Sequence, residues 1–399
     1  MKRVLMLGGS HFQVPSIITA KQMGCYVITC DYLPNNPGHK FADEYYNVST
    51  TEKEKVLDLA KKLNIDGIVC YASDPSAPTA AYVAEKLGLP GNPYRSVEIL
   101  ANKDLYREFL SNNGFRVPRA KGFSSLSEAE KDFDNFTAPV MVKPVDSCGS
   151  KGVSKVFHKA ELANAIEAAL SYSRCHRFIL EEYVEKSGYQ VAGDGFSVDG
   201  KLVFRCFANE HFSLEGTNPF VPIGESWPYI MPERVQDKIH QEIQRAITLL
   251  GMKTGAYNFD IRLDKDENVY LMEIGPRNGG NLIPQVTKYA TNVDMVKYTI
   301  MAALGEDCHE IAMAPVQGFW SCYIIHSNKK GILKEIQIDP DLKNNIVEMN
   351  MLYKPGDQVE AFTGSNGTLG TMILKYSSQQ EMLEKMDHMD KWLKVIVDE

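Results

Sequence analysis

The first ninety residues alternate short apolar runs with amphipathic segments. The runs RVLMLG, YVITCD and DGIVCYA predict three strands, and the spacing of apolar positions predicts helices over 14–23, 52–63 and 75–87. An order of strand, helix, strand, helix, strand, helix favours a doubly wound parallel sheet. We therefore expect residues 1–95 to form an N-terminal α/β domain.

The pattern changes after a turn-rich break, GLPGNPYRS, at 88–96. Two strands, PVMVKP and SKVFH, flank a small-residue loop, and the strand RFILEEYV follows. Two hairpins are predicted, the first turning at Asp199-Gly200 and the second spanning 254–275. The helices expected in this region cover about 96–110 (two helices), 159–173, 233–250 and 280–304 (two helices).

From about residue 315 the sequence predicts short strands and a closing helix near 379–395. The expected fold class is therefore multidomain, α/β and α+β, with a small C-terminal α+β domain. We expect domains at 1–95, 96–312 and 313–399, and a lid subdomain at about 115–185 within the second.

Composition excludes several classes of protein. The 399 residues are 44% hydrophobic and carry a net charge of −8, which argues against a nucleic-acid or anionic-membrane partner. The eight cysteines show no CxxC spacing, so we expect reduced thiols and no metal-ligand cluster. The first apolar run is too short for a signal peptide or a membrane span, so we expect a cytoplasmic protein, and a homodimer is compatible with the sequence.

The segment VKPVDSCGSKGVSKV, residues 142–156, has the composition of a phosphate-binding loop. Lys143 ends a strand, and backbone N–H groups and hydroxyls of the small-residue loop could meet phosphate oxygens. It lacks the Walker A spacing, and the protein-kinase motifs are absent. A mobile surface hairpin is the alternative. The loop residues with this potential are Ser147, Gly149, Ser150 and Gly152.

The second hairpin places two carboxylates together. A register symmetric about the turn at Asp266-Glu267 sets Asp260 opposite Glu273, and residues directly opposite share a face. Such a pair repels unless a cation lies between the carboxylates, and hard divalent cations bind oxygen ligands. A solvated acidic face is the alternative. The other, apolar face is expected to hold Phe259, Ile261, Leu263, Tyr270, Met272 and Ile274.

These motifs, in this order, resemble those of the ATP-grasp superfamily of ATP-dependent ligases. The resemblance covers about 101–304 and rests on NKDLYREFL, PVMVKPVDSCGSKGV, FILEEYV and FDIRL with LMEIGPRNGGN. It implies an ATP-grasp fold that uses ATP and Mg²⁺, with Mn²⁺ as a substitute. It also implies that Lys103 and Lys143 contact ATP phosphates and that residues 147–152 form the lid loop.

The same resemblance implies roles for further residues. The linker that reads the adenine edge would be Glu181, Glu182, Tyr183 and Val184. Asp260 and Glu273 would bind magnesium, and Arg277 would steady the transferring phosphoryl group.

Two positions depart from the family pattern. Gly275 stands where many members have an Asn metal ligand, and Gln190 stands where a Glu commonly binds the ribose. One metal ligand is therefore missing or replaced, and Gln190 is offered in place of the ribose-binding Glu.

The activity that this resemblance implies is ligation of a carboxylate to an amine, forming a C–N bond and ADP. The substrates would be small molecules, a carboxylic or amino acid and an amine, and the tail resembles that of L-amino-acid ligases and biotin-carboxylase-like enzymes. A purine-pathway or carbamoyl-phosphate-type ligase is the first alternative, and an ATP-binding protein without ligase turnover is the second. An NAD-dependent oxidoreductase is disfavoured because LGGSHFQVPS lacks the G-x-G-x-x-G fingerprint.

Overall fold

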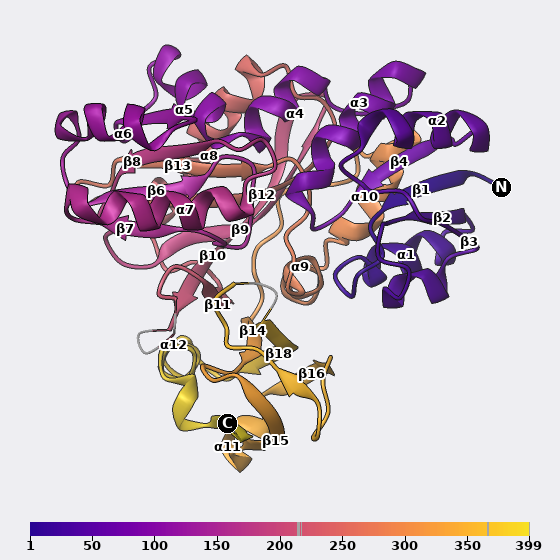
Figure 1. Cartoon of the computed structure of the whole chain (residues 1–399). Helices are drawn as coiled ribbons and strands as arrows, with labels where there is room; N and C mark the ends of the chain where they lie inside the picture. The colour runs from indigo at the N-terminus through magenta and orange to yellow at the C-terminus, as the bar shows by residue number, and fades with distance from the viewer. Residues whose placement is uncertain (214–215, 217, 365–366, 399) are drawn as a thin grey trace.

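The N-terminal region is a four-stranded parallel sheet with helices on both faces (Figure 1). The structure is a computed structural model that describes residues 1–213, 216, 218–364 and 367–398. The strand order is β3-β2-β1-β4. All of the strand pairs are parallel, and a parallel sheet is what the sequence pattern predicts. The elements are β1 (Arg3–Leu7), α1 (Val14–Gln22), β2 (Tyr26–Cys30), β3 (Glu44–Tyr46), α2 (Lys53–Leu63), β4 (Gly67–Cys70), η2 (Asp74–Ser76) and α3 (Ala77–Leu87).

Alternate residues of β1 belong to two different cores. Leu5 and Leu7 pack with residues of α2 and α3, whereas Val4 and Met6 pack with residues of α1 and of α10 (Met295–Leu304). Because both faces are covered, the strand has an unbroken apolar sequence. Helix α10 comes from far along the chain and lies beside β4 (Figure 1), so it fastens the N-terminal sheet to the region that follows.

A second four-stranded sheet, with order β5-β8-β6-β7, is antiparallel and carries the small-residue loop. Its core includes Val142, Ile166 and Phe178. The loop of residues 145–153 joins β6 to β7. The elements from residue 94 onward are α4 (Tyr94–Ala101), α5 (Lys103–Asn112), β5 (Ala120–Phe123), α6 (Leu126–Asp132), β6 (Val140–Pro144), β7 (Ser154–Val156), α7 (Leu162–Tyr172) and β8 (Phe178–Glu182).

The largest sheet has eight strands in the order β13-β12-β9-β10-β11-β14-β18-β16. One face packs against α8 through Ile239 and Ile243, and the other packs against α9 through Ile283 and Val286. The elements up to residue 304 are β9 (Gln190–Val198), β10 (Lys201–Phe212), β11 (Pro222–Trp227), α8 (Glu233–Leu249), β12 (Gly255–Leu263), β13 (Val269–Gly275), α9 (Ile283–Thr291) and α10.

The C-terminal region extends this large sheet and adds a three-stranded sheet, β17-β15-β19. The multidomain α/β and α+β fold class is confirmed, while the domain boundaries stay predictions. Strands from both sides of residue 313 share the large sheet through the pairing of β11 with β14. The elements are β14 (Phe319–His326), β15 (Gly331–Ile338), α11 (Pro340–Lys343), β16 (Ile346–Met351), β17 (Gln358–Val359), β18 (Thr368–Tyr376), α12 (Gln379–Asp387) and β19 (Leu393–Asp398).

Several elements differ from the sequence prediction, and β5, α6 and β11 had no predicted counterpart. The closing helix expected over 379–395 ends at Asp387, and Val395 lies in β19 opposite Ile336 of β15. Residues Leu393–Asp398 alternate in burial and pair with β15 as an edge strand of the small sheet. A local sequence pattern does not reveal such a distant pairing partner. The short strand β3 was not predicted, because its three half-buried residues carry little apolar signal.

Close approach of β9 and β10 depends on Gly193. Its φ is +109°, and a Cβ there would lie 2.1 Å from the backbone oxygen of Cys206. We predict that Gly193→Ala lowers the free energy of unfolding by about 3 kcal/mol or more, combining the left-handed conformation and the clash. Gly24→Ala is the control, because Gly24 has a φ of +80° and no neighbour within 4 Å. Equal losses for both variants in urea unfolding would contradict this account.

Candidate active site

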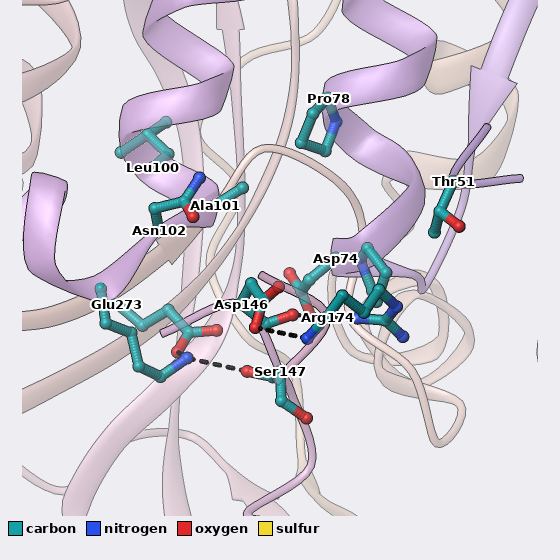
Figure 2. A pocket seen from close by; sticks show the side chains of 12 residues that line it. Thr51, Asp74, Pro78, Leu100, Ala101, Asn102, Asp146, Ser147, Arg174 and Glu273 are labelled. Atoms are coloured by element: carbon teal, nitrogen blue, oxygen red, sulfur yellow. Dashed lines mark hydrogen bonds and ion pairs between the residues drawn. The ribbon is translucent and has the colours of Figure 1, made fainter. Parts of the chain in front are cut away.

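A cavity of about 630 Å³ lies between the β5–β8 sheet and the large sheet. It is within the size range of small-molecule sites. A smaller cavity of about 170 Å³ adjoins it, and Figure 2 shows Asp74, Ser147 and Glu273 around that space. Of the predicted site residues, the large cavity is lined by Lys103, Lys143, Ser147, Gly149, Ser150, Tyr183, Gln190, Asp260, Glu273 and Arg277.

The remaining predicted residues, Gly152, Glu181, Glu182 and Val184, lie outside the set of described residues that line this cavity. Glu181 is fully buried behind Lys143, and the Glu182 carboxylate accepts a hydrogen bond from the Thr137 N–H, 2.7 Å away. The Val184 carbonyl accepts a bond of 3.0 Å from Arg262. The roles assigned to these residues stay predictions.

Lys103 is the first residue of α5 and reaches two acceptors at the cavity. Its Nζ lies 2.9 Å from the Ser147 carbonyl oxygen and 3.0 Å from Glu273 Oε2. Burial works against the charged lysine, but the Glu273 carboxylate outweighs it, so the pKa of Lys103 is raised. The predicted phosphate lysine therefore pairs with a predicted metal ligand.

Lys143 belongs to a buried group of three charges. Glu181 Oε1 lies 2.6 Å from Lys143 Nζ, and Glu181 Oε2 lies 2.5 Å from Arg107 Nε. Burial alone would raise the pKa of Glu181, but the two cations lower it to about 2. Burial lowers the pKa of Lys143, against the attraction of Glu181. Arg107 follows Lys103 by one helical turn on α5, a spacing that could have identified it from the sequence.

The loop between β6 and β7 is anchored across the cavity. Ser150 Oγ donates to the Phe220 carbonyl oxygen at 2.6 Å, and the Ser147 carbonyl accepts from Lys103. Gly149, Ser150 and Gly152 all have φ values between +56° and +67°, which small residues tolerate best. The loop thus lies over the cavity, where its N–H groups could meet an anionic ligand.

Asp260 and Glu273 stand opposite each other on β12 and β13, as the predicted register requires. Asp260 Oδ1 is buried without a hydrogen-bond partner among the described residues. Burial raises the pKa of Asp260, and the Glu273 charge adds to this effect. A divalent cation fits this pair, because it would satisfy the unpartnered oxygen and relieve the repulsion.

The apolar face predicted for this hairpin is partly wrong. The register shifts between Asp260 and Ile261, so Ile261 pairs with Leu271. Beyond this bulge, Val269 and Leu271 join the core, and Met272 lines the cavity instead. Tyr270, which was also expected in the core, is only half-buried. A bulge inserts one unpaired residue and so reverses the faces of the residues beyond it.

Arg277 is held by Asp74 of η2 in the N-terminal region. Its Nε and Nη2 donate to the two oxygens of Asp74 at 2.8 and 2.5 Å. Burial raises the pKa of Asp74, but the Arg277 charge outweighs it, so the net shift is downward. Asp74 was not predicted, although it follows the carboxyl end of β4, where ligands meet parallel sheets.

The same ion pair accounts for Gly275. A Cβ at this position would lie 2.9 Å from Asp74 Oδ1 and 3.2 Å from Arg277 Cζ. The carboxylate of Asp74 thus occupies the space that a side chain at 275 would need. A larger residue at position 275, such as the Asn of the family pattern, would collide with this ion pair between Asp74 and Arg277.

Gln190 takes part in a polar row across the large sheet. Its Oε1 accepts from Arg262 Nε at 2.7 Å, and its Nε2 donates to Glu210 Oε2 at 2.6 Å. Its amide is therefore engaged at both ends, and the predicted ribose contact stays a prediction. Glu210 and Glu225, which also line the cavity, were missed because strands distant in the sequence bring them there.

The described residues contain no group of three or more His, Cys, Asp or Glu side chains arranged to hold a metal ion. Further ligands for a cation at Asp260 and Glu273 would have to come from phosphate oxygens or water. Among the helices that the structure describes, none is long and apolar enough to cross a membrane.

Comparison with known proteins identifies the central region. Residues 136–285 match the ATP-grasp domain family. A formate-dependent phosphoribosylglycinamide formyltransferase from Prochlorococcus marinus (strain NATL2A) is 27% identical over 325 residues, covering 79% of this chain and 81% of that protein.

Two solved structures share the fold along the whole chain. An L-amino acid ligase from Bacillus licheniformis has a TM-score of 0.81 at 22% identity, over 100% of this chain and 99% of the other. A phosphoribosylglycinamide synthetase from Anaerococcus prevotii has a TM-score of 0.76 at 23% identity, over 100% of both chains. The resemblance inferred from the four ordered motifs is thereby confirmed: this chain carries an ATP-grasp domain at residues 136–285.

Proposed function

We propose that the protein is an ATP-dependent carboxylate–amine ligase that joins a small carboxylic or amino acid to an amine. The observation that carries this proposal is the convergence of Lys103, Lys143 and Arg277 with the facing acids Asp260 and Glu273 in one cavity beneath a small-residue loop. This arrangement suits a nucleotide triphosphate, a divalent cation and a second anion. The family match and the relatives support the same activity.

The proposed chemistry has two steps. A substrate carboxylate oxygen attacks the γ-phosphorus of ATP, the bond to the β–γ bridging oxygen breaks, and ADP leaves. The nitrogen of the amine then attacks the carbonyl carbon of the acyl phosphate, inorganic phosphate leaves, and the amine loses a proton. Mg²⁺, held by Asp260 and Glu273, would neutralise phosphate charge when bound.

The residues of this chain would supply position and charge. Lys103 and Lys143, now paired with carboxylates, would exchange these partners for phosphate oxygens, and Arg277 is oriented by its two bonds to Asp74. The loop at 147–152 covers the cavity, and exclusion of water would protect the acyl phosphate from hydrolysis.

A purine-pathway type of ATP-grasp ligase is the second candidate, favoured by the 27% identity to the formyltransferase. The test of both is release of ADP and phosphate from ATP with a panel of carboxylic acids, amines and phosphoribosyl amines, followed by mass spectrometry of the product. Turnover that requires both an acid and an amine supports the ligase. ATP binding without turnover on any pair would favour a nucleotide-binding protein instead.

Lys143 is predicted to contribute to nucleotide binding more than to folding. Lys143→Met leaves Glu181 paired with Arg107, so the variant should fold. Loss of hydrogen bonds to a charged group costs about 1.5–3 kcal/mol, so ATP affinity should fall roughly 10- to 100-fold. Calorimetric titration measures this, with the exposed Lys61→Met on α2 as the control. Unchanged affinity in a folded Lys143→Met variant would refute the prediction.

The two facing acids should differ in their effect on stability. Asp260→Asn and Glu273→Gln should each reduce ATP turnover roughly 100-fold or more. Asp260→Asn should leave the free energy of unfolding unchanged or raised, because one oxygen of Asp260 has no partner. Glu273→Gln should lower it by about 1–3 kcal/mol, because Lys103 loses its carboxylate.

Denaturant unfolding without nucleotide, together with ADP release, separates these effects. Full activity in Asp260→Asn would show that the pair is an acidic face and not a metal site.

A further inference from the structure

A second pair of facing carboxylates, on β10 and β11, lies in the same cavity. Glu210 on β10 stands directly opposite Glu225 on β11. Residues directly opposite share a face, and both side chains line the cavity. Glu210 is 9% exposed and Glu225 is 8% exposed, so neither charge is screened by bulk water.

The two carboxylates are not equally compensated. Glu210 is reached by a hydrogen-bonded chain that runs from Arg262 through Gln190, and Lys186 is a further cation that contributes to its surroundings. Glu225 Oε2 is buried and has no hydrogen-bond partner among the described residues. The charge of Arg277 acts to lower the pKa of Glu225, but burial and the neighbouring carboxylates outweigh it, so the pKa is raised.

An unpaired buried carboxylate is costly, and it must be relieved by a proton or by a cationic ligand. Burial, together with the charge of Asp260, raises the pKa of Glu210 to about 8. Burial and the charge of Glu210 also raise the pKa of Glu225. The geometry favours a cationic ligand over a proton. The unpartnered oxygen belongs to a side chain that lines a cavity large enough for a substrate.

The chemistry of the pair suits an ammonium group. A primary ammonium has three donors and is satisfied by two carboxylates and one further acceptor. Two carboxylates also keep the ammonium protonated, so it has no lone pair with which to attack. Such a site suits an amino group that does not react.

Resting on the proposed ligase function, we propose that Glu210 and Glu225 bind the ammonium group of the carboxylic substrate, which makes that substrate an α-amino acid. Its carboxylate would then lie toward Asp260, Glu273 and Arg277, where phosphoryl transfer is expected. The pair holds the amino group of this first substrate unreactive while the second amine attacks the acyl phosphate. The acid that is activated and the amine that attacks are thereby kept distinct.

The first test compares α-amino acids with their 2-hydroxy analogues. The twenty standard L-amino acids and the matching 2-hydroxy acids, including L-alanine with L-lactate, are incubated with ATP, magnesium and hydroxylamine, which traps an acyl phosphate as a hydroxamate. We expect hydroxamate from one or more amino acids and at least tenfold less from the analogues. Equal yields would overturn the ammonium site and leave the ligase function standing. No hydroxamate from any acid would overturn the proposed function and this inference with it.

The second test uses Glu225→Gln, which keeps the shape of the side chain and removes its charge. The KM for the amino acid should rise roughly 10- to 100-fold, the loss expected for a hydrogen bond to a charged group. The KM for ATP should stay within twofold, and preference for the amino acid over its 2-hydroxy analogue should fall. Glu335→Gln, an exposed acid on β15, is the control and should change neither constant.

Folding of the variant is checked by thermal unfolding. Because Glu225 has an unpartnered oxygen, Glu225→Gln should be as stable as the parent or more stable. A folded Glu225→Gln protein with an unchanged KM for the amino acid would overturn the proposal.

Discussion

The structure depends on how its buried charges are paired around one cavity. Burying an ion is costly unless it finds a partner of opposite sign. Four ion pairs in three groups supply such partners, and each joins segments that are distant in the sequence: Lys103 with Glu273, Lys143 and Arg107 with Glu181, and Arg277 with Asp74. Without a ligand, the cations that suit phosphates are neutralised by the protein's own carboxylates. Under the proposed function, a nucleotide and a divalent cation would exchange these partners: phosphate oxygens would pair with the lysines, and the cation would pair with Glu273.

The pairs also connect the regions of the chain. Asp74 comes from η2, just after β4, and its partner Arg277 follows β13. Helix α10 packs against the N-terminal sheet through Val296 and Ile300. The N-terminal region thus completes the cavity, and Gly275 leaves the room that Asp74 needs. Gly275, which departs from the family pattern, thus makes room for the contact between Asp74 and Arg277.

Local sequence patterns were sufficient to predict part of the fold and part of the candidate site. The alternation of strands and helices predicted the parallel sheet, and symmetry about a turn predicted that Asp260 faces Glu273. The bulge after Asp260 was beyond that reasoning, because a register symmetric about the turn has no place for the extra residue in β13. Glu210 and Glu225 could not be associated from the sequence either, because β10 and β11 are joined by a loop whose length hides their register. Asp74, by contrast, could have been identified from the sequence, because it follows the carboxyl end of a parallel strand, where ligands bind.

The central claim is that a carboxylate is activated by phosphorylation in this cavity. It is tested most directly with a substrate acid labelled with ¹⁸O at both carboxylate oxygens. Attack of one of these oxygens on the γ-phosphorus leaves it bonded to phosphorus, so the account predicts that one ¹⁸O atom per turnover appears in the inorganic phosphate, as measured by mass spectrometry. Phosphate free of ¹⁸O, formed while the amide product accumulates, would contradict it.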